Sequence, residues 1–322
     1  MDDSSAFRWV LDVNCLWPNP PEASQTTKAT DHWATGEDAS QALKLLTPEE
    51  RAKVLRFYRP SDARLSLASS LLKHLAIVKT CDVTWSEAIV GEDRNKKPCY
   101  KPNNASKKGC EFNVSHHGTL VALAGCTGNK VNLGVDVVQI NWERDYQKVI
   151  KDGFEAWANI YEMVFSEREL KDIAGYVPPA QLDSREEIRA KLRHFYAHWC
   201  LKEAYVKMTG EALLSDSLKQ LEFRNVQVPM PRSHLPPDAQ GSDEWGQVCT
   251  DVEIWFRNER VNHIKLVIQA FREDYMIATA SSSTHIHFSE FKELNLENDV
   301  YPSAEMTHEE HPNIRKSIGA ST

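Results

Sequence analysis

Apolar residues recur at helical spacing in some stretches of the chain and form the alternating or continuous runs of strands in others. The predicted helices cover residues 47–57, 61–78, 154–165, 166–174 and 185–208. The predicted strands cover residues 7–15, a hairpin at 112–124 that turns at 116–118, and runs at 131–140, 218–226, 252–256, 263–271 and 275–281. Because helices and strands come in alternating groups, this order predicts an α+β protein of two comparable halves.

Several predicted helices carry a start or stop signal. Thr47-Pro48-Glu49-Glu50 and the pair Ser166 and Glu169 match the capping box, in which the first side chain accepts a hydrogen bond from the backbone of the third helical residue. Ser61 is the expected cap of the second helix, and Gly210 is expected to end the long one.

Two segments lack such periodicity. Residues 20–45 are rich in proline, serine, threonine and acids, which predicts a loose surface connection. Beyond Phe288 acidic residues outnumber basic ones, which predicts a weakly ordered tail.

The composition excludes several classes of protein. Among 322 residues, 41% hydrophobic and 26% charged residues are typical of a soluble globular enzyme and exclude disorder and fibres. No stretch approaches 18 consecutive apolar residues, and the acidic, polar start does not resemble a signal peptide, so we expect a cytosolic protein. The seven cysteines form no C-x-x-C pair, which predicts reduced thiols.

The charge is unevenly distributed. A net charge of −8 argues against nucleic acid as a partner. Between Arg51 and Lys108, however, 13 basic and 5 acidic residues give +8, which leaves −16 for the rest. Such a loop is ordinarily only solvated, but it would also suit a multiply phosphorylated small ligand. The basic residues near its centre are Arg94, Lys96, Lys97, Lys101, Lys107 and Lys108.

Asp136 is an acid inside an apolar strand. No other acid lies in the run from Val131 to Val138. An ionised carboxylate there is costly unless a cation or several hydrogen-bond donors meet it. The ordinary explanation is an aspartate that binds a backbone turn at the strand end, and the alternative is a metal ligand.

Trp199, Glu203 and Lys207 share one face of the long predicted helix, because they are spaced four residues apart. Taken alone, Glu203 and Lys207 are explained by a solvated ion pair. The aromatic residues just before them indicate the wall of a cleft instead.

A polar cluster ends the first strand of the predicted hairpin. Asn113, Ser115 and His116, with the N–H groups of the turn, are donors suited to phosphate, although a plain hairpin turn also explains them. A serine hydrolase triad is a poor interpretation, because the G-x-S-x-G motif is missing.

Five motifs occur in a specific order. They are Lys97-Pro98, Phe112-Asn113-Val114-Ser115-His116, Gly134-Val135-Asp136, Phe165-Ser166-x-x-Glu169 and Trp199-x-x-Lys202-Glu203-Ala204-x-x-Lys207. In order and spacing, the set resembles the Sfp-type 4′-phosphopantetheinyl transferases over about residues 47–281, and is closest to their fungal and human-type branch.

The resemblance implies an enzyme, a holo-[acyl-carrier-protein] synthase. It would transfer the 4′-phosphopantetheine arm of coenzyme A to a serine of an apo acyl- or peptidyl-carrier domain and release adenosine 3′,5′-bisphosphate. Asp136 and Glu203 match the family's acidic Mg²⁺ ligands. Glu203 also matches the residue that takes the serine proton, and Lys207 the lysine that stabilises or protonates the leaving phosphate.

The resemblance also implies residues that bind coenzyme A. Ser115 and His116, with Asn113 beside them, match residues that contact its phosphates. Lys97 matches a lysine near the pyrophosphate, and Arg94 lies in the same loop. Lys53 matches a basic position that binds the 3′-phosphate, for which Arg64 is a weaker candidate. One position departs from many bacterial members, because Val138 stands where they have a second acid. We therefore expect two protein carboxylates and more water on the metal, with no role for Val138 or Gln139.

The implied fold is a monomer with a pseudo-two-fold pair of similar halves, each a small, mainly antiparallel sheet with helices. Residues 1–130 would form the half with the basic region, residues 131–285 the half with the Mg²⁺ ligands and the catalytic helix, and residues 286–322 a C-terminal tail, with coenzyme A at the junction of the halves.

The implied partners are carrier domains of fatty acid, polyketide and nonribosomal peptide synthases and of the aminoadipate reductase of lysine biosynthesis. No nucleic acid or membrane partner is expected. Two rival hypotheses stay open on the residues alone: a Mg²⁺-dependent phosphohydrolase of coenzyme A or a nucleotide, and a non-catalytic module that binds carrier domains.

Overall fold

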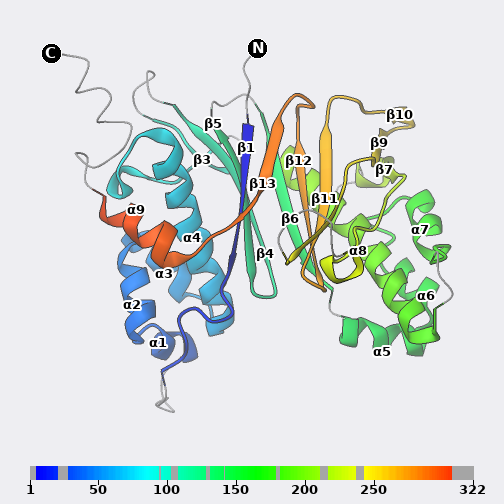
Figure 1. The fold of residues 1–322 in the computed structure, drawn as a ribbon, viewed down its shortest axis with the longest axis horizontal. Coiled ribbons are helices and arrows are strands. Elements are labelled where there is room, and N and C mark those ends of the chain that lie inside the picture. Colours follow the sequence, from blue (N-terminus) through cyan, green and yellow to red (C-terminus); the bar gives the residue numbers. More distant parts are fainter. Residues whose placement is uncertain are drawn as a thin grey trace. The chain divides into compact units, whose positions relative to one another are not determined.

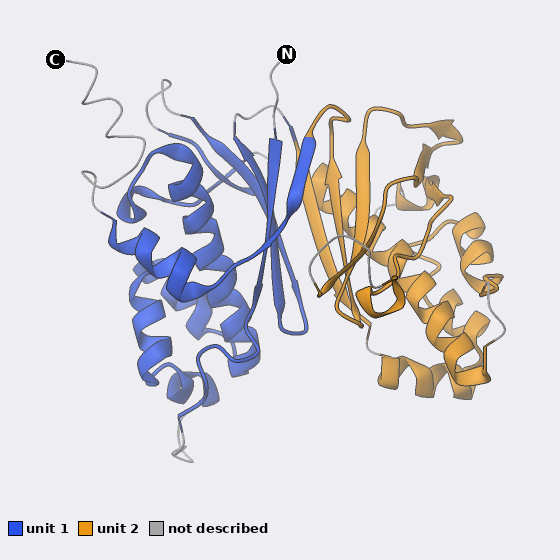
Figure 2. Cartoon of the chain, viewed as in Figure 1, with its two compact units in different colours: residues 1–131, 287–322 blue, residues 132–286 orange. Residues whose placement is uncertain are grey.

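The chain divides into two compact units, each containing helices and sheet (Figure 2). The computed structural model describes residues 5–20, 28–93, 96–102, 108–127, 131–140, 142–178, 182–210, 217–236 and 243–306. Unit 1 comprises Met1–Val131 and His287–Thr322, and unit 2 comprises Asn132–Ile286. The predicted α+β class is confirmed.

Unit 1 contains a sheet in the order β13-β1-β5-β4-β3-β2. Its neighbouring strands are antiparallel, except that β1 and β13 are parallel. The predicted hairpin is confirmed as β4 and β5, with Gly118 at φ 61° in its turn. The strands are β1 (Ser5–Asp12), β2 (Gly91–Glu92), β3 (Pro98–Tyr100), β4 (Cys110–His117), β5 (Leu120–Thr127) and β13 (His287–Glu293).

Helix α4 packs against β4 and β5 and supplies much of the core of unit 1 (Figure 1). The capping box at Thr47 is confirmed, but Ser61 is not a cap. Helix α4 instead begins at Pro60, because proline is pre-organised for the first helical position and Arg59 before it is extended. The helices of this region are α1 (Ala29–Trp33), α2 (Glu37–Lys44), α3 (Pro48–Leu55), α4 (Pro60–Cys81) and the short η1 (Trp85–Glu87).

The prediction of a loose connection over residues 20–45 is wrong where the structure describes them, because α1 and α2 form there. Their apolar side chains complete the core: Trp33 is fully buried, and its Nε1 donates to the Trp17 carbonyl oxygen at 2.8 Å. Residues 21–27 lie outside the described residues.

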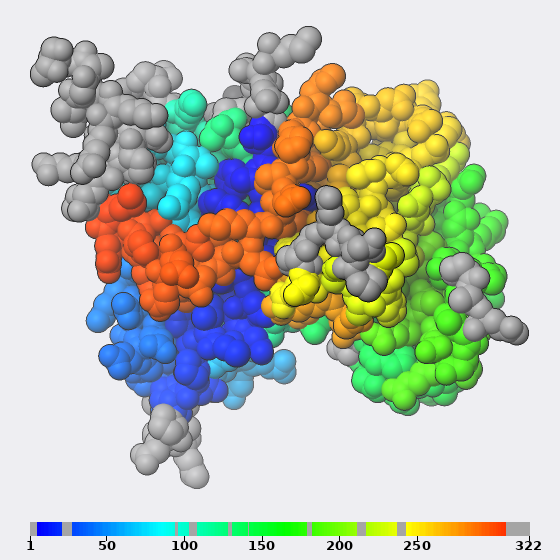
Figure 3. Space-filling view, in the orientation of Figure 1, coloured from blue at the N-terminus to red at the C-terminus, as the bar shows by residue number. Residues whose placement is uncertain are grey.

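The prediction of a weakly ordered tail is also wrong for residues 288–306. After β13 the chain forms the π-helix η4 (Leu296–Val300) and α9 (Tyr301–Glu305), which cross the surface of the N-terminal helices as an orange-to-red band (Figure 3). Leu296 and Val300 enter the core of unit 1. Residues 307–322 lie outside the described residues.

Arg8 of β1 attaches this segment to the sheet. Its Nε donates to the Ser289 carbonyl oxygen at 2.7 Å, and its guanidinium lies 4.2 Å from the ring centre of Phe291 and 5.4 Å from that of Phe288. Burial lowers the pKa of Arg8 to about 10, which leaves it charged at neutral pH. A sequence window cannot reveal this contact, because its partners are about 280 residues apart.

The described residues of unit 2 form two antiparallel sheets. One has the order β6-β12-β11-β8 and the other β10-β9-β7. The strands are β6 (Leu133–Gln139), β7 (Leu221–Arg224), β8 (Trp245–Cys249), β9 (Glu253–Phe256), β10 (Glu259–Arg260), β11 (Lys265–Phe271) and β12 (Tyr275–Ser281).

The long helix α8 packs against β6 and β12 in the core of unit 2 (Figure 1). It ends as predicted at Gly210, whose φ of 79° suits glycine. The helices are α5 (Trp142–Asp152), α6 (Phe154–Asn159), α7 (Glu167–Ala174), α8 (Ser184–Thr209) and the short η2 (Leu218–Gln220) and η3 (Arg232–His234). Within the described parts of the chain, no helix is long and apolar enough to cross a lipid bilayer.

A chain that ends at Ile286 is expected to lose the native fold of unit 1. It lacks β13 and the buried Leu294, Leu296 and Val300. Three buried aliphatic side chains contribute roughly 5 kcal/mol or more, comparable to the whole stability of a small domain. Hydrogen exchange should therefore show lost protection in β1 and β5, while a chain that ends at Met306 keeps it. Equal protection of β1 in both truncated chains would contradict this prediction.

Candidate functional site

Strand β6 and helix α8 approach each other most closely at Gly134. A Cβ atom there would collide with the backbone oxygen of Ala204 and lie 2.5 Å from the backbone nitrogen of Met208. Both obstacles are main-chain atoms of α8, so a side chain cannot be accommodated by a rotamer change. Glycine therefore sets the distance between the strand and the helix and the register in which they meet.

Asp136 lies two residues further along β6 and so on the same face as Gly134. The residue is 5% exposed. Lys207 of α8 donates from Nζ to Asp136 Oδ1 at 2.5 Å. The thiol of Cys200 donates to the Asp136 backbone oxygen at 3.4 Å, which joins the same residue to the helix a second time. The anomalous acid of the sequence is thus met by a cation, as the cost of burying a carboxylate requires.

Glu203 lies one helical turn before Lys207. Burial raises the pKa of the Glu203 carboxyl, and the negative charge of Asp136 adds to the rise, while Lys207 opposes it. The structure therefore brings Asp136, Glu203 and Lys207 together. The solvated i,i+4 pair considered from the sequence does not describe this arrangement, because Lys207 is ion-paired with a strand residue.

Lys202 and Glu169 form an ion pair that is completely buried. Lys202 Nζ lies 2.6 Å from Glu169 Oε2, and both side chains are 0% exposed. The ammonium also donates to the Leu221 backbone oxygen at 2.8 Å. Glu169 accepts from the backbone nitrogens of Ser166 at 2.9 Å and Phe223 at 3.0 Å. The pair therefore links α8, the start of α7 and the strand β7.

Hydrogen bonds offset the cost of burying this pair. Burial raises the pKa of Glu169 and lowers that of Lys202, and the attraction between them opposes both changes. The confirmed capping box of α7 is part of the same network, because Ser166 Oγ accepts from the backbone nitrogen of Glu169. The sequence marked both residues only as motif positions, since no local pattern reveals an ion pair across 33 residues.

The aromatic residues of α8 differ in their surroundings, because Phe195 and Trp199 pack in a core cluster while His198 lines a cavity. Phe195 is 1% exposed and meets Trp157 edge-on, with ring centres 4.5 Å apart. Trp199 packs against Tyr161 in the same way, at 5.5 Å. These rings belong to a core cluster that joins α8 to α6 and α7. The predicted cleft wall is therefore wrong for Phe195 and Trp199, because an amphipathic helix can bury aromatic residues beside its charged positions.

The predicted phosphate-binding residues of unit 1 lie on or beside β3 and β4. Asn113 and Ser115 occupy one face of β4 and are 7% and 5% exposed, while His116 lies on the other face and is exposed. Lys97, directly before β3, is 8% exposed, and burial lowers its pKa while Asp93 and Glu111 oppose the shift. The Lys97 backbone nitrogen donates to Asp93 Oδ1 at 2.8 Å.

The two candidates for binding the 3′-phosphate differ, because one is exposed and the other is hydrogen-bonded within unit 1. Lys53 is exposed in the last turn of α3. Arg64 is committed to other contacts, because its guanidinium donates to the Trp17 carbonyl oxygen at 3.0 Å and to Asn19 Oδ1 at 2.9 Å. Arg94 and Lys107 lie outside the described residues.

The described residues contain no group of three or more histidine, cysteine, aspartate or glutamate side chains placed to hold a metal ion. Asp136 and Glu203 are two carboxylates and do not form such a group. Val138, where many bacterial members of the resembled family have a second acid, is an apolar residue that is 2% exposed. Two carboxylates with water are compatible with Mg²⁺, which keeps several of its waters in protein sites.

Replacing Lys202 with methionine is expected to destabilise unit 2 by roughly 3–5 kcal/mol, because it leaves the buried Glu169 carboxylate without its cation. Lys191→Met is the matched control on the same helix. Lys191 pairs with Glu187 at 2.6 Å, but that pair is partly exposed and should contribute less than about 1 kcal/mol. Urea unfolding of both variants measures the difference, and equal midpoints would contradict a stabilising role for Lys202.

Comparison with known proteins identifies the family. A family model described as "4'-phosphopantetheinyl transferase, N-terminal" matches residues 31–128, and that of the "4'-phosphopantetheinyl transferase superfamily" matches residues 132–280. The 4'-phosphopantetheinyl transferase of Aureobasidium melanogenum is 35% identical over 337 residues, which cover 91% of this chain and 95% of the relative. The 4'-phosphopantetheinyl transferase A of Aspergillus fumigatus is 36% identical over 281 residues, which cover 74% of this chain and 77% of the relative.

A more distant relative is the L-aminoadipate-semialdehyde dehydrogenase-phosphopantetheinyl transferase of Xenopus laevis. It is 27% identical over 58% of this chain and 56% of the relative. The chain therefore belongs to the 4′-phosphopantetheinyl transferases, enzymes that transfer the phosphopantetheine group from coenzyme A to carrier proteins.

Proposed function

We propose that Asp136, Glu203 and Lys207 form the catalytic group of this transferase. The observation that carries the proposal is their convergence: a buried carboxylate on β6, a carboxylate whose pKa is raised, and an ammonium in contact with the first. A structural ion pair alone would need only Asp136 and Lys207. The additional half-buried acid beside them is a costly arrangement that a catalytic role explains.

We further propose that Asp136 and Glu203 bind Mg²⁺. Carboxylate oxygens are the protein ligands this ion prefers, and their mutual repulsion is relieved when a cation lies between them. The contact between Lys207 and Asp136 supports the proposal, because this carboxylate already has a cation as a partner. Bound Mg²⁺ would neutralise charge on the pyrophosphate of coenzyme A.

The same three side chains account for the steps of the transfer reaction. The carrier serine oxygen attacks the β-phosphorus of coenzyme A, so one phosphorus–oxygen bond forms and the pyrophosphate bond breaks. Glu203 accepts the serine proton, and its raised pKa favours that protonated state. Lys207 stabilises the charge that develops on the leaving adenosine 3′,5′-bisphosphate.

In unit 1 we propose that coenzyme A is held by the basic and polar residues around β3 and β4. Two nearly buried polar side chains on one face of β4 and a nearly buried lysine beside β3 support this, because such groups need a polar or charged environment. Ser115 and His116, with Asn113 beside them, would contact phosphates of coenzyme A. Lys97 would lie near the pyrophosphate, with Arg94 in the same loop, and Lys53 would bind the 3′-phosphate.

We propose a broad range of carrier partners: acyl- and peptidyl-carrier domains of fatty acid, polyketide and nonribosomal peptide synthases, and the aminoadipate reductase of lysine biosynthesis. The name of the Xenopus laevis relative, which refers to L-aminoadipate-semialdehyde dehydrogenase, supports the last of these. We also propose that the enzyme acts as a monomer. A location in the cytoplasm is supported by the seven cysteines, which are free thiols as expected in a reducing compartment.

Glu203→Gln is expected to lower transfer at least about 100-fold while coenzyme A still binds, because the amide cannot take the serine proton. The assay is the mass of apo carrier protein after incubation with coenzyme A and Mg²⁺, in which transfer adds one phosphopantetheine arm. Glu187→Gln is a matched control, since Glu187 also precedes a lysine by four residues on α8. Near-normal turnover of Glu203→Gln would remove Glu203 from the chemistry. Consumption of coenzyme A without carrier modification would indicate a phosphohydrolase instead.

Asp136→Asn is expected to raise the Mg²⁺ concentration for half-maximal activity by at least about tenfold, because a neutral amide is a weaker ligand than a carboxylate. Asp274→Asn is the control, since Asp274 also pairs with a cation of α8, Arg189, at 3.2 Å. An unchanged Mg²⁺ titration for Asp136→Asn would exclude Asp136 as a metal ligand.

A further inference from the structure

A cavity of about 590 Å³ in unit 2 is lined by the first half of α8 and by residues 227–231, which follow β7. Binding sites for small molecules usually have volumes of about 300–1,000 Å³. None of the described residues that line this cavity belongs to the proposed catalytic group or to the proposed coenzyme A site. Its lining includes the apolar residues Leu182, Ala190, Val228, Pro229, Met230 and Pro231.

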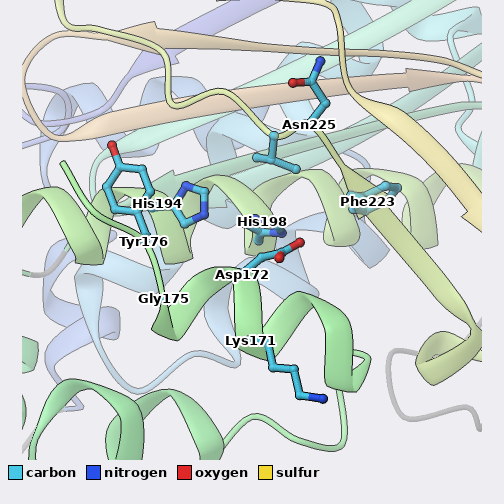
Figure 4. A pocket seen from close by; sticks show the side chains of 9 residues that line it. Lys171, Asp172, Gly175, Tyr176, His194, His198, Phe223 and Asn225 are labelled. Atoms are coloured by element: carbon cyan, nitrogen blue, oxygen red, sulfur yellow. The ribbon is translucent and has the colours of Figure 1, made fainter. Parts of the chain in front are cut away.

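Contacts within the protein hold the walls of this cavity in place. The Gln247 backbone nitrogen donates to the Met230 backbone oxygen at 2.9 Å, which attaches residues 227–231 to β8. A Cβ atom on Gly246 would collide with the same Met230 oxygen, so glycine permits this close approach. Tyr176, which also lines the cavity, stacks on His194 of α8, with ring centres 4.1 Å apart and planes at 9° (Figure 4). The cavity is therefore formed before a ligand binds.

Arg193 of α8 places a positive charge in the wall of the cavity. The residue is 9% exposed, and its guanidinium donates to the Glu273 backbone oxygen at 2.7 Å and to the Pro229 backbone oxygen at 2.9 Å. Both of these acceptor residues also line the cavity, so the guanidinium between them belongs to its wall. A guanidinium has five N–H groups, and these two bonds leave three for a further acceptor.

The charge of Arg193 is not balanced by a carboxylate in contact with it. Burial lowers the pKa of Arg193 to about 10, with a further contribution from the positive charge of Arg189, so the guanidinium stays charged at neutral pH. Asp274 and Glu273 oppose this shift, but among the described residues neither they nor another acid forms an ion pair with Arg193. Asp274 is paired with Arg189 at 3.2 Å, and the Glu273 carboxylate accepts from the Ser233 hydroxyl.

A purely structural role does not account for this buried charge. A neutral donor would serve the two backbone oxygens without the penalty of taking an unpaired charge out of water. An apolar cavity with one such charge in its wall instead suits a ligand that has an apolar body and a single anionic group. The charge complementarity is local, because it involves the one guanidinium of Arg193.

We propose that this cavity binds an aliphatic carboxylate of the size of a medium-chain fatty acid. The chain would lie against the apolar wall, and its burial there removes it from water. The carboxylate would accept N–H groups of Arg193, because the planar fork of a guanidinium matches two carboxylate oxygens. Arg189 lies four residues earlier on the same face of α8 and adds attraction for an anion. Glu186 also lines the cavity but is exposed, so water screens its repulsion.

The test is a calorimetric titration of the full chain with decanoate, below the concentration at which decanoate forms micelles. We expect one equivalent to bind and the thermal unfolding midpoint to rise, because a ligand that binds only the native state stabilises it. Decanol, which has the same chain without the carboxylate, should bind at least about tenfold more weakly. The absence of saturable binding, or equal affinity for the two compounds, would overturn the proposal.

Two variants locate the binding site. Ala190→Trp should fill the cavity from α8 and weaken decanoate binding at least about tenfold. Ala156→Trp on α6 is the matched control, because Ala156 is exposed and does not line the cavity. Arg193→Met should remove the preference for decanoate over decanol. If loss of its two backbone contacts unfolds that variant, Ala190→Trp decides, and unchanged decanoate binding by Ala190→Trp would refute the site.

Two further titrations keep this outcome independent of the proposed function. An excess of coenzyme A should leave decanoate binding unchanged, whereas displacement of decanoate would assign it to the coenzyme A site and overturn the proposal. Glu203→Gln should bind decanoate as tightly as the unaltered chain does. Failure of the proposed catalytic group would therefore not affect the result for this cavity.

Discussion

The buried ion pair of Lys202 and Glu169 fixes how the elements of unit 2 are arranged around the proposed catalytic group. Lys202 immediately precedes Glu203, and successive side chains on a helix point about 100° apart. Because Lys202 is held by Glu169 and by the backbone oxygen of Leu221, the orientation of α8 about its own axis is fixed. The Glu203 side chain therefore points from a different face of the helix than Lys202. Asp136 meets that side because Gly134 lets β6 approach the helix closely. The chemistry of the site therefore depends on a charge pair that takes no part in it.

The two ion pairs of α8 differ in a way that suits their different roles. Lys202 and Glu169 are shielded from water, so separating them is strongly unfavourable and the geometry stays fixed. Lys207 is 28% exposed, and its contact with Asp136 lies where solvent and ligands have access. Exchanging one cation for another there costs far less, because water screens the charges during the exchange. Helix α8 thus carries one ion pair that holds the fold together and one ion pair that a ligand could replace.

The sequence predicts features that depend on neighbouring residues better than features that depend on distant ones. The capping boxes at Thr47 and Ser166 and the stop at Gly210 follow from three or four adjacent residues, and the structure confirms them. Helices α1 and α2 and strand β13 were missed because their stability comes from packing against distant parts of unit 1. In the site, Asp136 stands out because a carboxylate in an apolar strand is anomalous by itself. The roles of Gly134 and Lys202 are invisible in the sequence, since each depends on a contact across the fold.

The parallel pairing of β1 with β13 has a consequence for how the protein is made. Strand β1 leaves the ribosome before unit 2, and its partner β13 leaves after it. Unit 2 is a continuous stretch of chain between them, so all of its residues emerge before β13 exists. During synthesis, unit 2 is therefore able to fold first, while the edge of β1 that pairs with β13 is still unpaired. Because of this order of synthesis, β1 completes its pairing only after the whole of unit 2 has been made.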